Sequence, residues 1–390
     1  MWLVYFQMPA LKVPQLKKLE PSRSDSFLLK SWTNLLALLT LLFVTSSTVP
    51  ILASFRGVGF PCYFVNLVDY STLNLTVRNS AKHLTPTLFL EGPEMFVYIV
   101  WSFLTEAINI IYFIFGAVTV YRLKKIFMPS LNAIQVWLTL IGGHSTLYLS
   151  IARLWTLQLF VHVLSFKQIF LAAFVYLFHF MLSYVHVHVF ISRYVPQWQA
   201  NDMEQKIPEG SSLEKLVLFY RPILANIQMS LLALEMLVFS LSVMMAVCNS
   251  FYILVSDAVF GAVNLFLIIS LVWHIGAEVF LAKYLRHHVG FYIGLFVAYV
   301  IMLLPVIRYD AIFVTSRLHK PITINMTIIP IICLIIIVVR IIRLRSQTST
   351  KVTYKKLGIS GAMEAQPFQS IPQPPRAKYT DLETESEDEL

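Results

Sequence analysis

Eight long apolar segments constrain this chain more than any other feature of its sequence. Each has about the length, roughly 20 residues, that an α-helix needs to cross the hydrocarbon core of a bilayer. Strands of a transmembrane barrel would instead alternate polar and apolar residues over about 10 positions. The sequence therefore predicts an all-α integral membrane protein with eight transmembrane helices, at residues 32–53, 95–120, 136–160, 169–191, 222–247, 258–282, 291–307 and 322–342.

Composition agrees with this class. Hydrophobic residues make up 57% of the 390 and charged residues 13%, whereas soluble domains carry about 25% charged residues. This balance excludes a water-soluble globular domain. The net charge of +9 fits a membrane protein whose basic residues gather in cytosolic loops. Membrane lipid is therefore an expected partner, and nucleic acid is not.

Charge distribution and a glycosylation motif give the same orientation. With eight spans both termini lie on one side, and that side then holds 22 of the 30 Lys and Arg residues, against 7 on the other. The positive-inside rule makes the termini cytosolic. The motif Asn74-Leu75-Thr76 then falls in a lumenal loop, residues 55–94, where N-glycosylation takes place.

The chain divides into three parts on this reading. Residues 1–31 form a cytosolic N-terminal arm, and residues 32–345 form the transmembrane domain. In residues 346–390, Ser, Thr, Gln, Pro and charged residues replace the apolar runs. Such a composition buries too little apolar surface to fold, so the sequence predicts a disordered cytosolic tail.

Cys62 carries the most specific prediction for the lumenal loop, because that loop contains no second cysteine. A lone cysteine in an oxidising compartment favours a bond to a residue outside its own loop. An interchain disulfide is the preferred interpretation, and an internal bond to Cys248, at the lumenal end of the fifth segment, is the alternative. Cys333 lies in the middle of the eighth segment and is interpreted as a packed apolar residue.

Glu106, Arg153 and Glu235 lie inside predicted spans, at depths that allow them to meet. Ionised groups in a membrane interior are costly and are usually paired. Interhelical ion pairs that fix packing are the favoured interpretation, and an ion or proton path is the alternative. Because one arginine neutralises a single carboxylate, the second carboxylate requires a proton or water.

Several histidines gather on and near the fourth segment: His179, His186 and His188, with His144 and His162 nearby. His186 and His188 point to different helix faces, which makes them a poor metal pair. We interpret them as polar packing near the cytosolic interface and predict no metal and no cofactor. No catalytic constellation is visible either, so an enzyme is not expected.

The tail carries sorting motifs. Those that start at Tyr354 and Tyr379 place a bulky apolar residue, Leu357 or Leu382, at the fourth position, as host sorting adaptors require of an extended peptide. Ser386 resembles an acidic-directed phosphorylation site, and phosphate would deepen the local negative charge. The surrounding acidic cluster comprises Asp381, Glu383, Glu385, Glu387, Asp388 and Glu389. Together these features suggest retrieval to the trans-Golgi network.

Several strings of the sequence resemble the herpesvirus envelope glycoprotein M family, most closely its gammaherpesvirus members. The resemblance covers roughly residues 27–345. Most of these strings lie in or beside the first lumenal loop: Gly59-Phe60-Pro61-Cys62-Tyr63-Phe64, Leu67-Val68-Asp69-Tyr70, Leu73-Asn74-Leu75-Thr76 and the run from His83 to Leu90; further matches are Leu234-Glu235, Gly261-Ala262-Val263-Asn264 and Arg308-Tyr309-Asp310.

This resemblance implies an eight-span, non-enzymatic glycoprotein of the virion envelope membrane. Its family partner is the small single-span glycoprotein N, held as a disulfide-linked heterodimer through the cysteine that matches Cys62. The resemblance also implies roles in virion assembly, secondary envelopment and egress, with location in host trans-Golgi network and endosomal membranes and in the host nuclear membrane. The alternative function is that of a multispan membrane transporter that uses Glu106, Arg153 and Glu235.

Overall fold

The computed structural model describes residues 23–54, 93–127, 131–166, 168–192, 207–208, 210–251, 253, 255–277, 288–308 and 319–356. Within these ranges all regular secondary structure is helical, which confirms the all-α class. Cys62, Asn74, Leu357 and the predicted tail sites from Tyr379 onward, including Leu382, Ser386 and the acidic cluster, lie outside the described residues. Those assignments therefore stay predictions.

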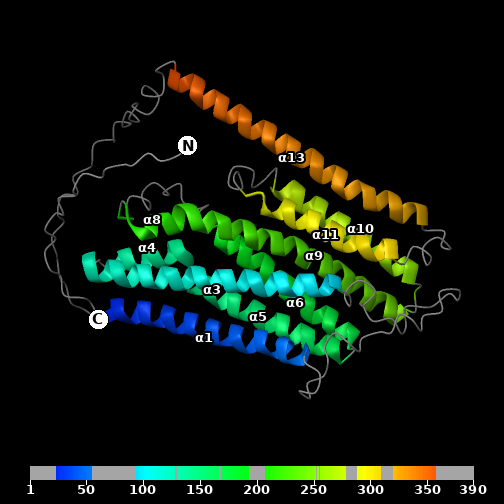
Figure 1. The fold of residues 1–390 in the computed structure, drawn as a ribbon, viewed down its shortest axis with the longest axis horizontal. Coiled ribbons are helices and arrows are strands. Elements are labelled where there is room, and N and C mark those ends of the chain that lie inside the picture. Colours follow the sequence, from blue (N-terminus) through cyan, green and yellow to red (C-terminus); the bar gives the residue numbers. More distant parts are fainter. Residues whose placement is uncertain are drawn as a thin grey trace, which may run out of the picture. The chain divides into compact units, whose positions relative to one another are not determined.

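Apart from Gly143 in the third, each of the eight apolar segments lies on helix wherever it is described. The elements are α1 (Arg23–Ser54), α3 (Pro93–Phe127), α4 (Leu131–Gly142), α5 (His144–Ser165), α6 (Ile169–Ser192), α8 (Ser212–Lys215), η3 (Leu216–Tyr220), α9 (Arg221–Phe251), α10 (Val255–Ile275), α11 (Gly290–Arg308) and α13 (His319–Lys356) (Figure 1).

Five stretches of the described helices are long and apolar enough to cross a membrane. Two further apolar stretches, Phe260–Ile275 on α10 and Gly290–Leu303 on α11, are shorter. The chain is therefore a multispan membrane protein. The five long stretches are Phe27–Thr48, Val97–Ile126, Ile169–Ile191, Ser212–Cys248 and Thr323–Arg343.

The third predicted span, residues 136–160, is not one continuous helix, and that prediction was wrong. α4 ends at Gly142 and α5 begins at His144. Two consecutive glycines weaken a helix, and a Cβ atom at Gly142 would lie 2.5 Å from the Phe113 ring. The indole N–H of Trp32 donates to the Gly142 carbonyl oxygen, 2.8 Å away. This contact with α1 satisfies a carbonyl group at the break.

Arg221 lies at the start of α9, one residue before the predicted span 222–247, and joins two other helices. Its side chain is buried and donates to the carbonyl oxygens of Phe190, at 2.6 Å, and of Leu140. These carbonyls belong to the last turns of α6 and α4, where a cation is favourable. The guanidinium also lies over the Phe190 ring, 4.9 Å from its centroid.

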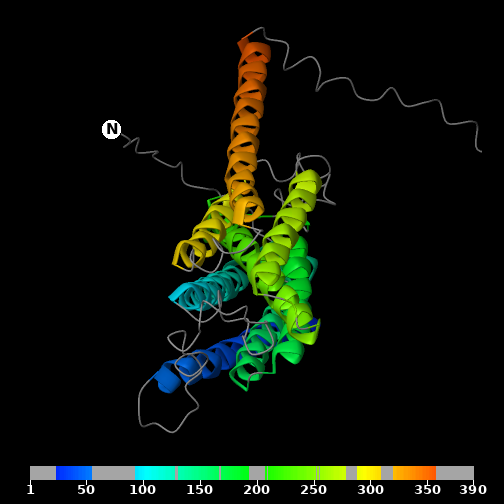
Figure 2. The same ribbon diagram turned by 90° about the vertical axis from the view of Figure 1, so that its right-hand side faces the viewer.

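The chain divides into two units, with the boundary between Leu334 and Ile335 inside α13. In the first unit α9 is central: α3, α6, α10 and α11 pack on it, and α1 packs on α5 (Figures 1 and 2). α11 approaches α9 closely at Gly290 and Gly294. A Cβ atom at either position would collide with the backbone of Asn226 or Ser230. Small residues four positions apart allow such close packing between membrane helices.

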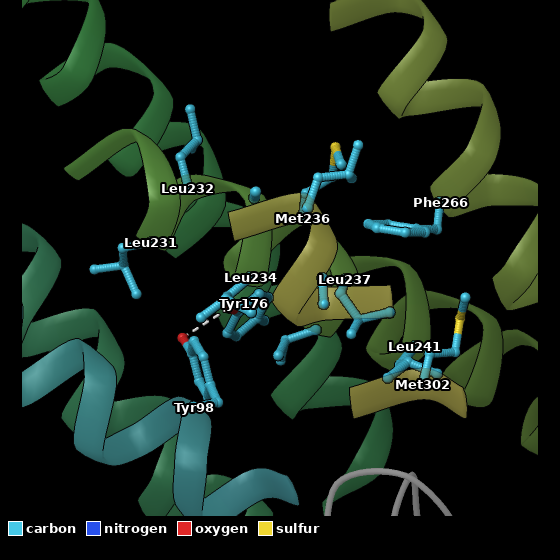
Figure 3. Packing of buried hydrophobic residues seen from close by; sticks show 14 of the residues in the cluster. Tyr98, Tyr176, Leu231, Leu232, Leu234, Met236, Leu237, Leu241, Phe266 and Met302 are labelled. Atoms are coloured by element: carbon cyan, nitrogen blue, oxygen red, sulfur yellow. Dashed lines mark hydrogen bonds between the residues drawn. The ribbon is translucent and has the colours of Figure 1, made fainter. Parts of the chain in front are cut away.

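The larger hydrophobic cluster surrounds α9 (Figure 3). Leu232, Met236 and Leu241 of α9 belong to it, as does Phe266 of α10. At its edge, the hydroxyl groups of Tyr98 on α3 and Tyr176 on α6 share a hydrogen bond of 2.8 Å (dashed in Figure 3). A second cluster lies around α1, α3 and α4.

α13 continues to Lys356, past the predicted start of the tail at residue 346. Tyr354 therefore lies on a helix. The predicted disorder does not hold for the described residues of the tail up to Lys356.

Candidate functional site

The structure brings Glu106 of α3, Arg153 of α5 and Glu235 of α9 together inside the first unit. Each side chain is at most 4% exposed. Arg153 donates through Nη1 to Glu106 Oε1, at 3.0 Å, and through Nη2 to Glu235 Oε1, at 3.1 Å. One guanidinium thus bridges two carboxylates from two other helices.

α6 adds three side chains to this charge cluster. His179, Ser183 and His186 are spaced so that they share one face of the helix. Arg153 Nε donates to Ser183 Oγ at 2.9 Å, and Nη1 lies 3.2 Å from His186 Nδ1. Because arginine only donates, His186 Nδ1 accepts and its proton sits on Nε2, which lies 3.0 Å from Ser150 Oγ.

The second histidine of this face, His179, has acceptors at both ring nitrogens. Its Nδ1 lies 3.1 Å from the Arg153 carbonyl oxygen and its Nε2 lies 3.2 Å from Glu235 Oε1. The Thr156 hydroxyl lies 3.0 Å from the same Nδ1 and donates to backbone carbonyl oxygens of its own helix at 2.9 Å. His179 thus joins the backbone of α5 to the Glu235 carboxylate of α9.

The charge cluster comprises Glu106, Arg153, His179 and Glu235. Arg153 contacts both carboxylates, and His179 adds a second contact to Glu235. Ionisable side chains in a membrane interior are usually paired with one another in this way.

Uncharged side chains complete the cluster. Asn109 Nδ2 donates to Glu106 Oε2 and to Ser150 Oγ, both at 3.2 Å. Gln228 Nε2 donates to Asn109 Oδ1 at 3.3 Å, which ties a second turn of α9 to α3. These contacts hold Glu106 in place and extend the polar connection between α3, α5 and α9.

The earlier interpretation of the histidines requires correction. Both His179 and His186 are buried: His179 is a member of the charge cluster, and His186 contacts its arginine. His188 differs: it is exposed, and its ring stacks on that of Tyr184. The signal that could have identified the first pair is their spacing of seven, which returns to the same helix face after two turns.

The remaining predicted positions are placed as follows. Cys248 and Cys333 are buried in the larger hydrophobic cluster. His162 Nδ1 lies 3.0 Å from the Gln158 carbonyl oxygen. Among the described residues, no group of three His, Cys, Asp or Glu side chains is arranged to hold a metal ion. The charge cluster is therefore the polar site that these helices build.

Replacing His179 by phenylalanine is expected to destabilise the protein, because an aromatic ring is retained while the polar contacts of both ring nitrogens are lost. Leaving a buried acceptor unsatisfied costs about 1–3 kcal/mol. Thermal unfolding of the detergent-purified protein measures the effect. The matched control is His188→Phe on the exposed face of the same helix, which should unfold at the wild-type temperature. Equal melting temperatures for both variants would contradict the assigned role of His179.

These features define a class: a helical multispan membrane protein whose spans are joined internally by a buried charge cluster. The family model described as herpesvirus glycoprotein M matches residues 25–357. The chain belongs to this family, as its sequence motifs suggested.

Curated relatives agree with the family assignment. The chain is 52% identical over 322 residues to envelope glycoprotein M of human herpesvirus 8, covering 83% of this chain and 80% of the relative. Envelope glycoprotein M of saimiriine herpesvirus 2 is 50% identical over 329 residues, covering 84% and 90%. The Epstein-Barr virus protein of the same name is 44% identical over 326 residues, covering 84% and 80%. No solved structure matches the chain.

Proposed function

We propose that this protein is a multi-pass glycoprotein of the virion envelope that pairs with the small glycoprotein N and directs it to the host trans-Golgi network. There the pair supports virion assembly, secondary envelopment and egress. The match to the family over residues 25–357, with relatives named envelope glycoprotein M, carries this proposal. Its location would include host endosomal and nuclear membranes. The protein acts as a scaffold and not as an enzyme.

Eight spans with both termini cytosolic form part of the proposal. The basic residues of two helix ends support it. α3 ends with Lys124 and Lys125, and α13 carries Arg340 and Arg343 at the end of its apolar stretch. Both ends face the cytosol under this topology, as the positive-inside rule requires. The loop between α1 and α3 then faces the lumen, with Asn74 as its glycosylation site.

The buried charge cluster supports a structural role over the transport alternative. The carboxylates of Glu106 and Glu235 are bound by Arg153, and Glu235 also contacts His179. A transported ion would have to displace these contacts. We therefore propose that the cluster fastens α3, α5, α6 and α9 into a rigid frame that presents the lumenal loop.

Accessibility labelling tests the topology. In a background without native cysteines, Ser80→Cys should react only with a reagent supplied to the lumenal side, and Lys124→Cys only from the cytosol. Asn74→Gln should migrate faster than wild type and should not respond to glycosidase. Cytosolic labelling at position 80 would refute the proposed orientation.

The tail is expected to act as a retrieval signal for the trans-Golgi network. Tyr379→Ala with Leu382→Ala should shift the steady-state protein from the trans-Golgi network to the cell surface, measured by surface biotinylation and microscopy. Neutralising Glu387, Asp388 and Glu389 should shift it more weakly, and phosphate at Ser386 should strengthen retrieval.

A matched variant uses the other motif of the tail. Tyr354 lies on α13, whereas adaptors bind an extended peptide, so Tyr354→Ala with Leu357→Ala should leave the distribution unchanged. If neither double variant moves the protein, host sorting adaptors do not recognise this tail.

A further inference from the structure

A groove runs between α1 and α3 in the first unit. Its volume is about 630 Å³, and its lining is almost entirely apolar. On α1 the lining comprises Thr33, Leu36, Ala37, Thr40, Leu41 and Val44, and on α3 it comprises Ile114, Ala117, Val118 and Tyr121. Both sets lie within the stretches long and apolar enough to span a membrane, so the groove lies within the bilayer.

The lining residues follow helical spacing on both sides. From Thr33 to Val44 they cover about 16 Å of α1, and the two helices run antiparallel along it. The floor is formed by the buried side chains of Leu36 and Ala117, while Leu41 and Val118 stand 62% and 43% exposed as walls. At one end, Thr33 Oγ1 lies 3.4 Å from the Tyr121 hydroxyl.

This lining suits a third transmembrane helix better than a lipid chain. Ala37 and Thr40 on α1 and Ala117 in the floor are small, so the backbone of an incoming helix can approach closely. Helices in membranes associate through such small residues and through hydroxyl groups that bond across the interface. At the end of the groove the Tyr121 hydroxyl, 3.4 Å from Thr33 Oγ1, is such a group, whereas the Thr33 hydroxyl donates to the Leu29 carbonyl oxygen of its own helix at 2.8 Å.

The chain also indicates which helix occupies the groove. The two helices that line it are the ones that the lumenal loop joins, because α1 ends at Ser54 and α3 begins at Pro93. Cys62 follows Ser54 by eight residues, a tether of at most about 29 Å. The groove therefore lies within reach of a single-span partner bonded to Cys62.

We propose that the groove between α1 and α3 is the docking site for the transmembrane helix of the disulfide-linked single-span partner. This inference rests on the proposed function, since that function supplies the partner. It assigns the association within the membrane to residues distinct from Cys62, so the complex has a covalent and a non-covalent component.

The test uses the full chain with Cys62→Ser, co-expressed with glycoprotein N, so that only non-covalent association is measured. Ala37→Trp fills the groove from an exposed position and should lower the amount of co-purified partner by about tenfold, the size of effect typical of contacts between membrane helices. The matched control is Val272→Trp on α10, also at an exposed position, which should leave the amount unchanged. Equal recovery from both variants would overturn the proposal.

Photocrosslinking gives a readout that does not depend on a bulky substitution. A benzophenone amino acid at Leu41 should form an adduct with the partner, and the same probe at Val272 should not. If Leu41 forms an adduct with lipid alone while wild type still forms the disulfide-linked complex, the groove is not the docking site. The proposed function is then left intact. A wild-type chain that forms no complex with the partner overturns both.

Discussion

Replacement of Arg153 by leucine is expected to lower the thermal stability of the purified protein sharply. The guanidinium is the common partner of Glu106 and Glu235, at 3.0 and 3.1 Å, and leucine would leave both carboxylates buried without it. Breaking a buried ion pair by removing one partner costs about 3–5 kcal/mol in soluble proteins. The melting temperature in detergent, followed by size-exclusion of the heated protein, measures the loss.

A compensated variant separates a structural role from a transport role. When Glu106→Gln and Glu235→Gln are added to Arg153→Leu, no carboxylate is left without its cation, and much of the lost stability should return. A site for ion transport would instead lose its function in every one of these variants without regard to stability. A melting temperature of Arg153→Leu equal to that of wild type would show that the bridge does not stabilise the fold.

The helices could be predicted from the sequence because the bilayer imposes one requirement on every span. An apolar run of the right length has to satisfy its own backbone hydrogen bonds, and a helix does so. The same rule does not predict a break in a helix when another helix satisfies the hydrogen bonds at the break. Gly142 and Gly143 do not interrupt the apolar run, yet the helix ends there, and the Trp32 indole N–H satisfies the Gly142 carbonyl oxygen at the break.

The charged members of the buried cluster could be predicted for a related reason. A charge within a span is rare and calls for a partner at its own depth, which identified Glu106, Arg153 and Glu235. The uncharged members carried no such signal. Ser150 and Ser183 join the cluster, whereas Ser240 and Ser270 on α9 and α10 donate to carbonyls of their own helices. Only the packed structure distinguishes these two uses of a serine.

Replacement of Cys62 by serine is expected to abolish the covalent complex with glycoprotein N completely. Co-expressed with this partner, the wild-type chain should run on a non-reducing gel as a larger species that collapses on reduction. Cys62 is the sole cysteine of the predicted lumenal loop, in a compartment where disulfides persist. The variant should therefore migrate as the single chain under both conditions.

The control is Cys248→Ser, and the structure indicates why it should keep the larger species. Cys248 is 1% exposed and packs in the hydrophobic cluster around α9. An internal bond would require the Cα atoms of Cys62 and Cys248 to approach within about 4.4–6.8 Å, with the loop entering that cluster. If Cys62→Ser keeps the larger species, or Cys248→Ser loses it, the interchain bond is wrongly assigned. Loss of the larger species in the first variant alone would assign the bond to Cys62 and leave the groove between α1 and α3 to account for any association that persists.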